Sequence, residues 1–247
     1  MHYRFYAPAL GPGDERIELP PDESAHAVRV MRVRPGAMVR VFNGHGLERA
    51  GVVLDARREH VSVELGARVE AAVEPHVLLT LAQAVLKADG MDQVVRDGVM
   101  LGVHTIVPLL SARAETDAAR LSRAGRLERW QRIAVASAKQ CGRAVVPVIR
   151  APLPLPAWLS ETTGGLRLLL TEPSVLGGMA GLDALRTLPA PLSATVMAGP
   201  EGGWDPTETE AALAAGYLPL TIGRRTLRAD AAAQAAIPVL QFLWGDL

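Results

Sequence analysis

Apolar and polar residues alternate along much of the N-terminal part of the chain, which is the pattern of half-buried strands. Residues 37–65, AMVRVFNGHGLERAGVVLDARREHVSVEL, alternate on both sides of the turn Asn43-Gly44-His45-Gly46. A β-hairpin in a small barrel or sandwich is predicted here. Residues 21–33, PDESAHAVRVMRV, instead have the spacing of a helix.

Beyond Pro75 the pattern changes to continuous apolar runs that alternate with longer helical stretches. Continuous runs between helices indicate strands of a parallel sheet that is covered on both faces. We therefore predict two domains, a small β domain over residues 1–72 and an α/β domain with a mostly parallel sheet over residues 73–247. The apolar runs are HVLLTLAQAV, VHTIVPLL, LRLLLTE, ATVMAG and LPLTI.

The composition predicts a protein that folds without disulfides or metal. The chain has 247 residues, 49% of them hydrophobic, and Cys141 is its single cysteine, expected to be a small buried residue. Neither a signal-peptide pattern at the N-terminus nor an uninterrupted apolar run of about 18 residues is present. These features predict a soluble, cytoplasmic protein with no membrane segment and no metal site.

Charge is distributed unevenly, although the 26 basic and 26 acidic residues balance. Residues 113–150 carry nine basic residues against three acidic ones, a net charge of +6, whereas residues 151–247 carry five against nine, a net charge of −4. We call residues 113–150 the basic segment. It is interpreted either as a footprint for a polyanion or as a solvated helix face, and charge alone does not separate the two.

Three loops follow late strands of the predicted sheet, where ligands bind in folds of this kind. They begin at Thr171-Glu172, at Gly199-Pro200-Glu201-Gly202-Gly203 and at Gly223-Arg224-Arg225. The second loop leads into a helix with Asp205 as N-cap, Pro206 at its first position and Glu208 placed for a capping box. Taken alone, this stretch is also what a well-made strand-to-helix turn requires. Neither the dinucleotide-binding glycine pattern nor a phosphate-binding loop with its lysine is present.

These motifs resemble those of the RsmE family of 16S ribosomal RNA uracil-N3-methyltransferases, which belong to the knotted SPOUT class. GPEGG and IGRRTLRADAAAQAA are similar to the family's GPEGG and LG-x-RILR-x-ETA, and KADGMD to K-G-x-K/R-M-D/E. LGVHTIVPL and RWQRIAVASAKQCGRAVVP are similar to LGV-x-x-I-x-P and to a run ending in Q-S-x-R-x-x-x-P. HAVRVMRVRPG and FNGHG resemble motifs of the family's PUA-like barrel. The resemblance therefore covers the whole chain, in order.

The resemblance implies a PUA-like N-terminal barrel and a C-terminal domain that binds S-adenosylmethionine (SAM) in a deep trefoil knot. It also implies a homodimer that acts on 16S ribosomal RNA of the small ribosomal subunit. The implied RNA-binding residues are Arg4, Arg29, Arg32, Arg126, Arg129 and Arg143. The implied SAM-binding residues are Thr171, Glu172, Gly199, Glu201, Gly203, Ile222, Gly223, Leu227 and Arg228.

Catalysis of this reaction requires positioning and the removal of a proton, because uracil N3 is protonated at neutral pH. Arg143, at the arginine of Q-S-x-R, is the candidate for holding a phosphate or the developing oxyanion. Glu172 and Asp230 are the candidates for accepting the proton. A third role for Asp230, the one that we favour, is to orient an arginine such as Arg228. A surface role for Arg143 and a helix-terminus role for Asp230 are the structural alternatives.

The chain departs from the family pattern at several positions. Asp230-Ala231-Ala232 replaces Glu-Thr-Ala, Gly90 replaces a basic residue, and Asp97, Met100 and Cys141 replace lysine, glutamate and serine. The motifs of the SAM site thus agree with the family pattern better than the surface of the helix that follows KADGMD does. Two other functions stay open, a ribose 2′-O-methyltransferase of the same class and a non-catalytic RNA-binding protein.

Overall fold

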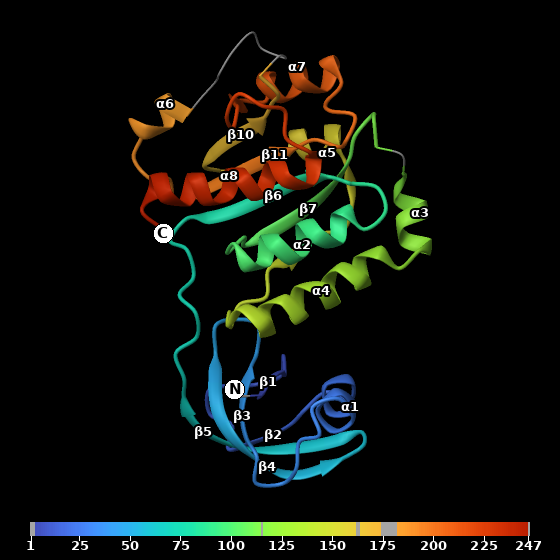
Figure 1. Ribbon diagram of the computed structural model, residues 1–247, viewed down its shortest axis with the longest axis vertical. Coiled ribbons are helices and arrows are strands. Elements are labelled where there is room, and N and C mark those ends of the chain that lie inside the picture. The colour runs from blue at the N-terminus through green and yellow to red at the C-terminus, as the bar shows by residue number, and fades with distance from the viewer. Residues whose placement is uncertain (1–2, 115, 162–163, 174–181, 247) are drawn as a thin grey trace. The chain divides into compact units, whose positions relative to one another are not determined.

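The chain divides into two units in the computed structural model, which describes residues 3–114, 116–161, 164–173 and 182–246 (Figure 1). The N-terminal unit contains Met1–Glu74 and Val135–Val146, and the C-terminal unit contains Pro75–Ala134 and Pro147–Leu247. The sequence pattern predicts a single boundary after residue 72, whereas in the structure the chain returns to the N-terminal unit for one further segment.

The N-terminal unit is built on a mixed five-stranded sheet with the order β1-β3-β4-β5-β2, in which only β1 and β3 run parallel. The predicted hairpin is confirmed as β3 and β4, and in its turn the side chain of Asn43 accepts hydrogen bonds from the backbone of His45 and Leu47. The predicted helix is confirmed as α1. The bounds are β1 Tyr3–Tyr6, β2 Arg16–Glu18, α1 Pro21–Arg29, β3 Met38–Phe42, β4 Glu48–Arg57 and β5 His60–Arg68.

Arg4 holds the segment from Val135 to Val146 in the N-terminal unit. Its guanidinium forms an ion pair with Glu48 at 2.6 Å and stacks on the ring of Phe42. It also donates hydrogen bonds to backbone carbonyls at the end of helix α4, Arg126–Cys141. The last carbonyls of a helix lack partners within the helix, so a cation stabilises them. The acceptors are the carbonyl oxygens of Ala138, Lys139, Gly142 and Arg143, at 2.8 to 3.3 Å.

The C-terminal unit contains a parallel sheet with the order β12-β10-β11-β6-β7-β8, and β9 also pairs with β7. The predicted parallel α/β domain is thus confirmed; the trefoil knot stays a prediction. The strands are β6 Leu78–Ala84, β7 Thr105–Leu110, β8 Val148–Ile149, β9 Leu153–Pro154, β10 Leu166–Leu170, β11 Ser193–Ala198 and β12 Leu218–Leu220. The helices are α2 Gly90–Met100, α3 Ala118–Arg123, α5 Leu155–Ser160, α6 Leu182–Arg186, α7 Pro206–Ala214, α8 Ala229–Trp244 and the first half of α4, whose residues from Val135 belong to the N-terminal unit.

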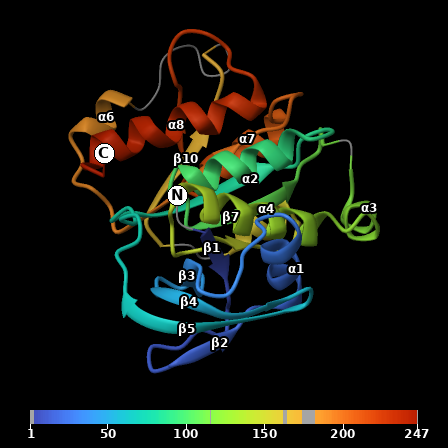
Figure 2. The ribbon, with the colours of Figure 1, turned by 60° about the horizontal axis from the view of Figure 1, so that its bottom comes forward.

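Helices cover both faces of this sheet, which explains why its strands are apolar on both sides. On one face, Leu155 and Trp158 of α5 pack with Ala82 and Met197 of the strands. On the other face α2 and α8 lie side by side (Figures 1 and 2), and α2 approaches Ile106 through Gly98. Within the ranges that the structure describes, no helix combines the length and apolar character that a membrane span requires.

Candidate functional site

A cavity of about 990 Å³ lies in the C-terminal unit beyond the carboxyl ends of β6, β10, β11 and β12. The chain order reverses near this position, because β6 is followed by β7 on one side whereas β11 and β10 lie on the other. Gly223 has a positive φ of 77° and does not line the cavity. The predicted residues that do line it are Thr171, Glu172, Gly199, Glu201, Gly203, Ile222, Leu227, Arg228 and Asp230.

The glycine loop, residues 199–203, forms a tight turn at the cavity. Gly203 has a left-handed backbone with φ of 68°, and its N–H donates to the carbonyl of Pro200 at 2.9 Å. A Cβ on Gly199 would lie 3.2 Å from the indole nitrogen of Trp204. The backbone conformation at position 203 therefore favours glycine, whereas a Cβ at position 199 would have to displace the indole of Trp204 by a few tenths of an ångström.

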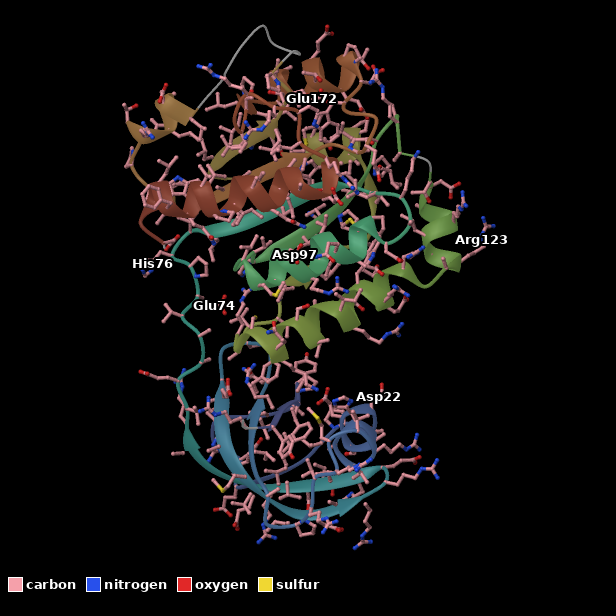
Figure 3. All side chains as sticks on the ribbon, in the orientation of Figure 1. Asp22, Glu74, His76, Asp97, Arg123 and Glu172 are labelled. Carbon is pink, nitrogen blue, oxygen red and sulfur yellow. The ribbon has the colours of Figure 1, made fainter. Side chains whose placement is uncertain are left out.

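Acidic side chains connect the glycine loop and its neighbours. Glu201 accepts a hydrogen bond from the backbone N–H of Lys87 at 2.9 Å and so holds the loop after β6. Glu172 accepts one from the hydroxyl of Thr226 at 3.3 Å, and Figure 3 shows Glu172 beyond the sheet of the C-terminal unit. One oxygen of Glu201 is thus engaged by the backbone, a role that the sequence did not indicate.

Ala88 is a strained residue in the wall of the cavity. Its φ is 46°, a left-handed conformation that costs a residue with a Cβ about 1–2 kcal/mol. It occupies the position of the glycine in the motif K-G-x-K/R-M-D/E, so the structure shows why that motif contains glycine. Sequence reasoning missed this departure from the motif.

Asp230 lies in the first turn of α8 and forms an ion pair with Arg228. The Nε and Nη2 atoms of Arg228 lie 3.2 and 3.1 Å from the two carboxylate oxygens. The side chain of Arg228 is 85% exposed at the cavity, and Asp230 is the carboxylate that pairs with it. Sequence reasoning proposed this pairing as one of three roles for Asp230.

Arg143 belongs to the N-terminal unit, whereas the cavity belongs to the C-terminal unit. Its side chain is only 5% exposed and forms an ion pair with Glu74 at 2.5 Å. A buried guanidinium requires such a carboxylate, because burial of an unpaired charge is very costly. Arg143 is therefore buried and paired with a partly exposed carboxylate, so the alternative of a surface role is wrong, and the RNA-contacting role that the motif implies stays a prediction.

The basic segment is largely neutralised by acidic residues from elsewhere in the sequence. Arg129, one of the predicted RNA-binding residues, lies 2.5 Å from the buried carboxylate of Asp92, and this hydrogen bond raises the pKa of Arg129. Asp92 also accepts a hydrogen bond from the indole of Trp130, which is buried. The other pairs are Arg113 with Asp205, Lys139 with Glu23, Arg143 with Glu74 and Arg150 with Glu161.

Four arginines of the basic segment have no acidic partner among the described residues. They are Arg120, Arg123, Arg126 and Arg132, on α3 and the first half of α4. Figure 3 labels Arg123 on α3. Of the remaining predicted RNA-binding residues, Arg29 and Arg32 are exposed in the N-terminal unit. Arg4 is mostly buried.

Cys141 is half-buried rather than fully buried, so that expectation was wrong in degree. Its thiol lies 3.8 Å from the carbonyl of Ala138, as is usual at the end of a helix. In the described part of the chain, no group of three or more histidine, cysteine, aspartate or glutamate side chains is placed to hold a metal ion.

Family models match segments of both units, and both models describe domains of RNA methyltransferases. Residues 73–241 match the RNA methyltransferase domain family, and residues 19–66 match the RNA methyltransferase PUA domain family. A ribosomal RNA small subunit methyltransferase E from a Synechocystis species is 30% identical over 215 residues, which cover 87% of this chain and 69% of the relative. The enzyme of the same name from Buchnera aphidicola is 24% identical, with coverage of 91% and 87%.

Solved structures of similar proteins cover almost the whole chain. A putative methyltransferase from Legionella pneumophila, in complex with SAM, has a TM-score of 0.88 at 28% identity and covers 98% of both chains. A ribosomal RNA small subunit methyltransferase E from Neisseria gonorrhoeae, bound to SAM, has a TM-score of 0.86 at 29% identity. It covers 99% of this chain and 98% of its own.

Proposed function

This chain belongs to the RsmE family of SAM-dependent ribosomal RNA methyltransferases, and we propose that it methylates N3 of a specific uridine in 16S ribosomal RNA. The observation that supports this most is the cavity, which gathers nine of the residues implied by the family motifs. These residues come from loops after three strands, β10, β11 and β12, and from the start of α8. Only the folded chain brings them together.

The chemistry of the cavity fits SAM. Its volume of about 990 Å³ is at the upper end for a small-molecule site, which leaves room for a nucleotide beside the donor. Glycine at positions 199 and 203 leaves backbone N–H and C=O groups accessible for hydrogen bonds to the donor. When bound, SAM supplies a methyl group on a sulfonium sulfur, which is a good leaving group.

Glu172 is the proton acceptor in this proposal. Both oxygens of Asp230 are engaged by Arg228, and one oxygen of Glu201 is engaged by the backbone of Lys87. Glu172, by contrast, accepts one long hydrogen bond from Thr226 among the described residues. A carboxylate with free accepting capacity, in the wall of the cavity, is best placed to take the N3 proton.

Arg228 supplies positive charge where negative charge develops on the uracil. Asp230 holds its Nε and Nη2, which leaves Nη1 to donate a hydrogen bond to a uracil oxygen. Asp230 is thus a positioning residue that acts through Arg228. This assignment moves to Arg228 the role that the sequence suggested for Arg143.

The substitution Asp230→Asn tests the positioning role. An asparagine oxygen still accepts one hydrogen bond from Arg228, so kcat should fall by less than about tenfold, with the donor Kd and the shape of the pH–rate profile unchanged. Steady-state kinetics from about pH 6 to about pH 10 measure this. A loss of about 10²–10⁴-fold that recovers at high pH would instead identify Asp230 as the base.

The RNA contacts are proposed to come from the arginines of α3 and α4 that lack an acidic partner among the described residues. Replacing Arg123, Arg126 and Arg132 together by alanine should weaken RNA binding. It should also lower the slope of log K against log salt by about 0.7–0.9 for each phosphate group that the variant no longer binds. Arg150→Ala is the matched control, because Arg150 is already paired with Glu161 at 2.7 Å. Binding titrations at several salt concentrations measure these slopes. Equal slopes for the triple variant and the wild type would show that the three arginines form a solvated helix face and do not bind RNA.

A homodimer in the cytoplasm that acts on the small ribosomal subunit completes the proposal. Phe242 of α8 is 72% exposed and Met100 of α2 is 42% exposed. The hydrogen bond from Gln241 to the carbonyl of Leu101 places the ends of these two helices side by side. The subunit contact is proposed at these exposed apolar side chains of α2 and α8.

Nucleoside mass spectrometry of 16S ribosomal RNA from a deletion strain tests the activity. Loss of 3-methyluridine, restored by the wild-type gene, is the expected result. Loss of a 2′-O-methylated nucleoside would identify a ribose methyltransferase instead. Calorimetry with SAM addresses the remaining alternative, since a non-catalytic RNA-binding protein would not bind the donor.

A further inference from the structure

The segment after β7 is tied to the glycine loop and to the start of α7 by three contacts. The backbone N–H of Ala112 donates to Glu208 at 2.7 Å. The Nη1 of Arg113 donates to the carbonyl of Gly202 at 2.9 Å, and its Nη2 lies 3.4 Å from a carboxylate oxygen of Asp205. The partners in these contacts are 96, 89 and 92 positions apart in the sequence, so only the fold brings them together.

The side chain of Arg113 lies directly against Gly202. A Cβ at position 202 would lie 3.4 Å from Cβ and 3.5 Å from Cδ of Arg113, which is the distance of direct packing. Gly203 next to it needs glycine because of its positive φ, and no such value is found at Gly202. The aliphatic part of Arg113 therefore covers Gly202, while its guanidinium binds the carbonyl of the same residue.

The two acids that face this segment also cap α7, so their positions are fixed. Asp205 accepts hydrogen bonds from the backbone and the hydroxyl of Thr207, at 3.1 and 2.8 Å. Glu208 accepts one from the backbone N–H of Asp205 at 3.0 Å with its other oxygen. The hydrogen bonds from Thr207, followed by the neighbouring Arg113, hold the pKa of Asp205 below its usual value, so it is charged at neutral pH.

We propose that Arg113 is a positioning residue for the SAM site, which fixes the peptide between Gly202 and Gly203 by binding the carbonyl of Gly202. This inference rests on the proposed function of the cavity, whose wall includes Arg113 and the whole glycine loop. A short loop with two consecutive glycines has a large conformational entropy when it is free. Fixing its backbone before the donor arrives lowers the cost of binding.

The alternative role for Arg113 is direct contact with RNA phosphate, since its side chain is 46% exposed. The two roles differ in what they require. A positioning residue affects the donor in the absence of RNA, whereas a phosphate contact affects only RNA affinity and its salt dependence. The planar guanidinium also matters for positioning, because lysine has one point charge and does not bind Gly202 and Asp205 in the same way.

Calorimetry with SAM in the absence of RNA, on the full chain, tests the proposal with three variants. Arg113→Ala should raise the donor Kd by about tenfold or more, since small displacements of binding groups have effects of this size or larger. Arg113→Lys should recover part of the affinity. Arg150→Ala, which removes another ion-paired arginine of the same unit, is the matched control and should leave the donor Kd unchanged.

Thermal unfolding and kinetics separate positioning from a general effect on stability. In the proposal, Arg113→Ala raises the KM for SAM more than it lowers kcat, and its Tm stays close to that of Arg150→Ala. An unchanged donor Kd, or an increase confined to the KM for RNA, would overturn the inference while leaving the proposed function standing. Failure of the wild-type chain to bind SAM would overturn the proposed function itself.

Discussion

Gly203→Val should abolish SAM binding, with a donor Kd raised by at least about 100-fold. The backbone at this position is left-handed, with φ of 68°, and a β-branched residue there is a severe outlier. The loop can accept valine only by changing the conformation of the peptides that face the cavity. Because a displacement of about 0.5 Å already matters at a binding site of this kind, binding should be lost rather than weakened. Calorimetry with SAM measures the effect.

Gly216→Val is the control for this experiment. Gly216 also has a left-handed backbone, with φ of 84°, and follows the other end of α7, but it does not line the cavity. Both substitutions therefore introduce similar backbone strain, and only one of them changes the site. Donor binding by the Gly203 variant at wild-type affinity would remove the glycine loop from the SAM site.

Glu172→Gln should lower kcat by about 10²–10⁴-fold, the usual effect of removing a general base. The amide keeps the shape of the side chain and can still accept the hydrogen bond from Thr226, so the donor Kd should change little. Residual activity should rise with pH, because solvent then deprotonates the uracil. Single-turnover kinetics over a range of pH values, together with calorimetry, measure both quantities.

The opposite division of effects would contradict this assignment. If Glu172 binds the donor rather than the proton, the glutamine variant will have a raised Kd for SAM and a nearly normal kcat at saturation. Comparison with Asp230→Asn makes the result specific, since both variants remove one negative charge from the same cavity wall. Only the base should show a large fall in kcat that recovers at high pH.

The elements predicted correctly from the sequence are those that local signals determine. Asp205, Pro206 and Glu208 predict the start of α7, and the structure contains that capping box. The Asn-Gly turn predicts the hairpin of β3 and β4, and the continuous apolar runs predict the parallel strands of the C-terminal unit. In each case the residues that fix the structure lie within a few positions of one another.

The interactions that were not predicted depend on partners far away in the sequence. Arg129 pairs with Asp92 at a separation of 37 residues, and Arg143 pairs with Glu74 at a separation of 69. A charge count over residues 113–150 includes the arginines but not these acids, so it overstates the positive charge that is free to bind RNA. Ala88 shows a different limit, because its left-handed backbone depends on the loop rather than on its own preference.

The hydrogen bonds from Arg4 to the end of α4 affect how this protein folds as it is synthesised. Arg4 and the carbonyls that it binds are 134 to 139 residues apart, so at about 5–20 residues per second the ribosome delivers them roughly 7 to 28 seconds apart. Until then Glu48 and the ring of Phe42 are the partners of the guanidinium among the described residues, and the nascent N-terminal strands lack their final segment. A shortened protein that ends near residue 72 would lack the segment from Val135 to Val146 permanently. The N-terminal unit is therefore one compact unit in the folded chain, but it is completed only after the intervening residues Pro75–Ala134 have been synthesised.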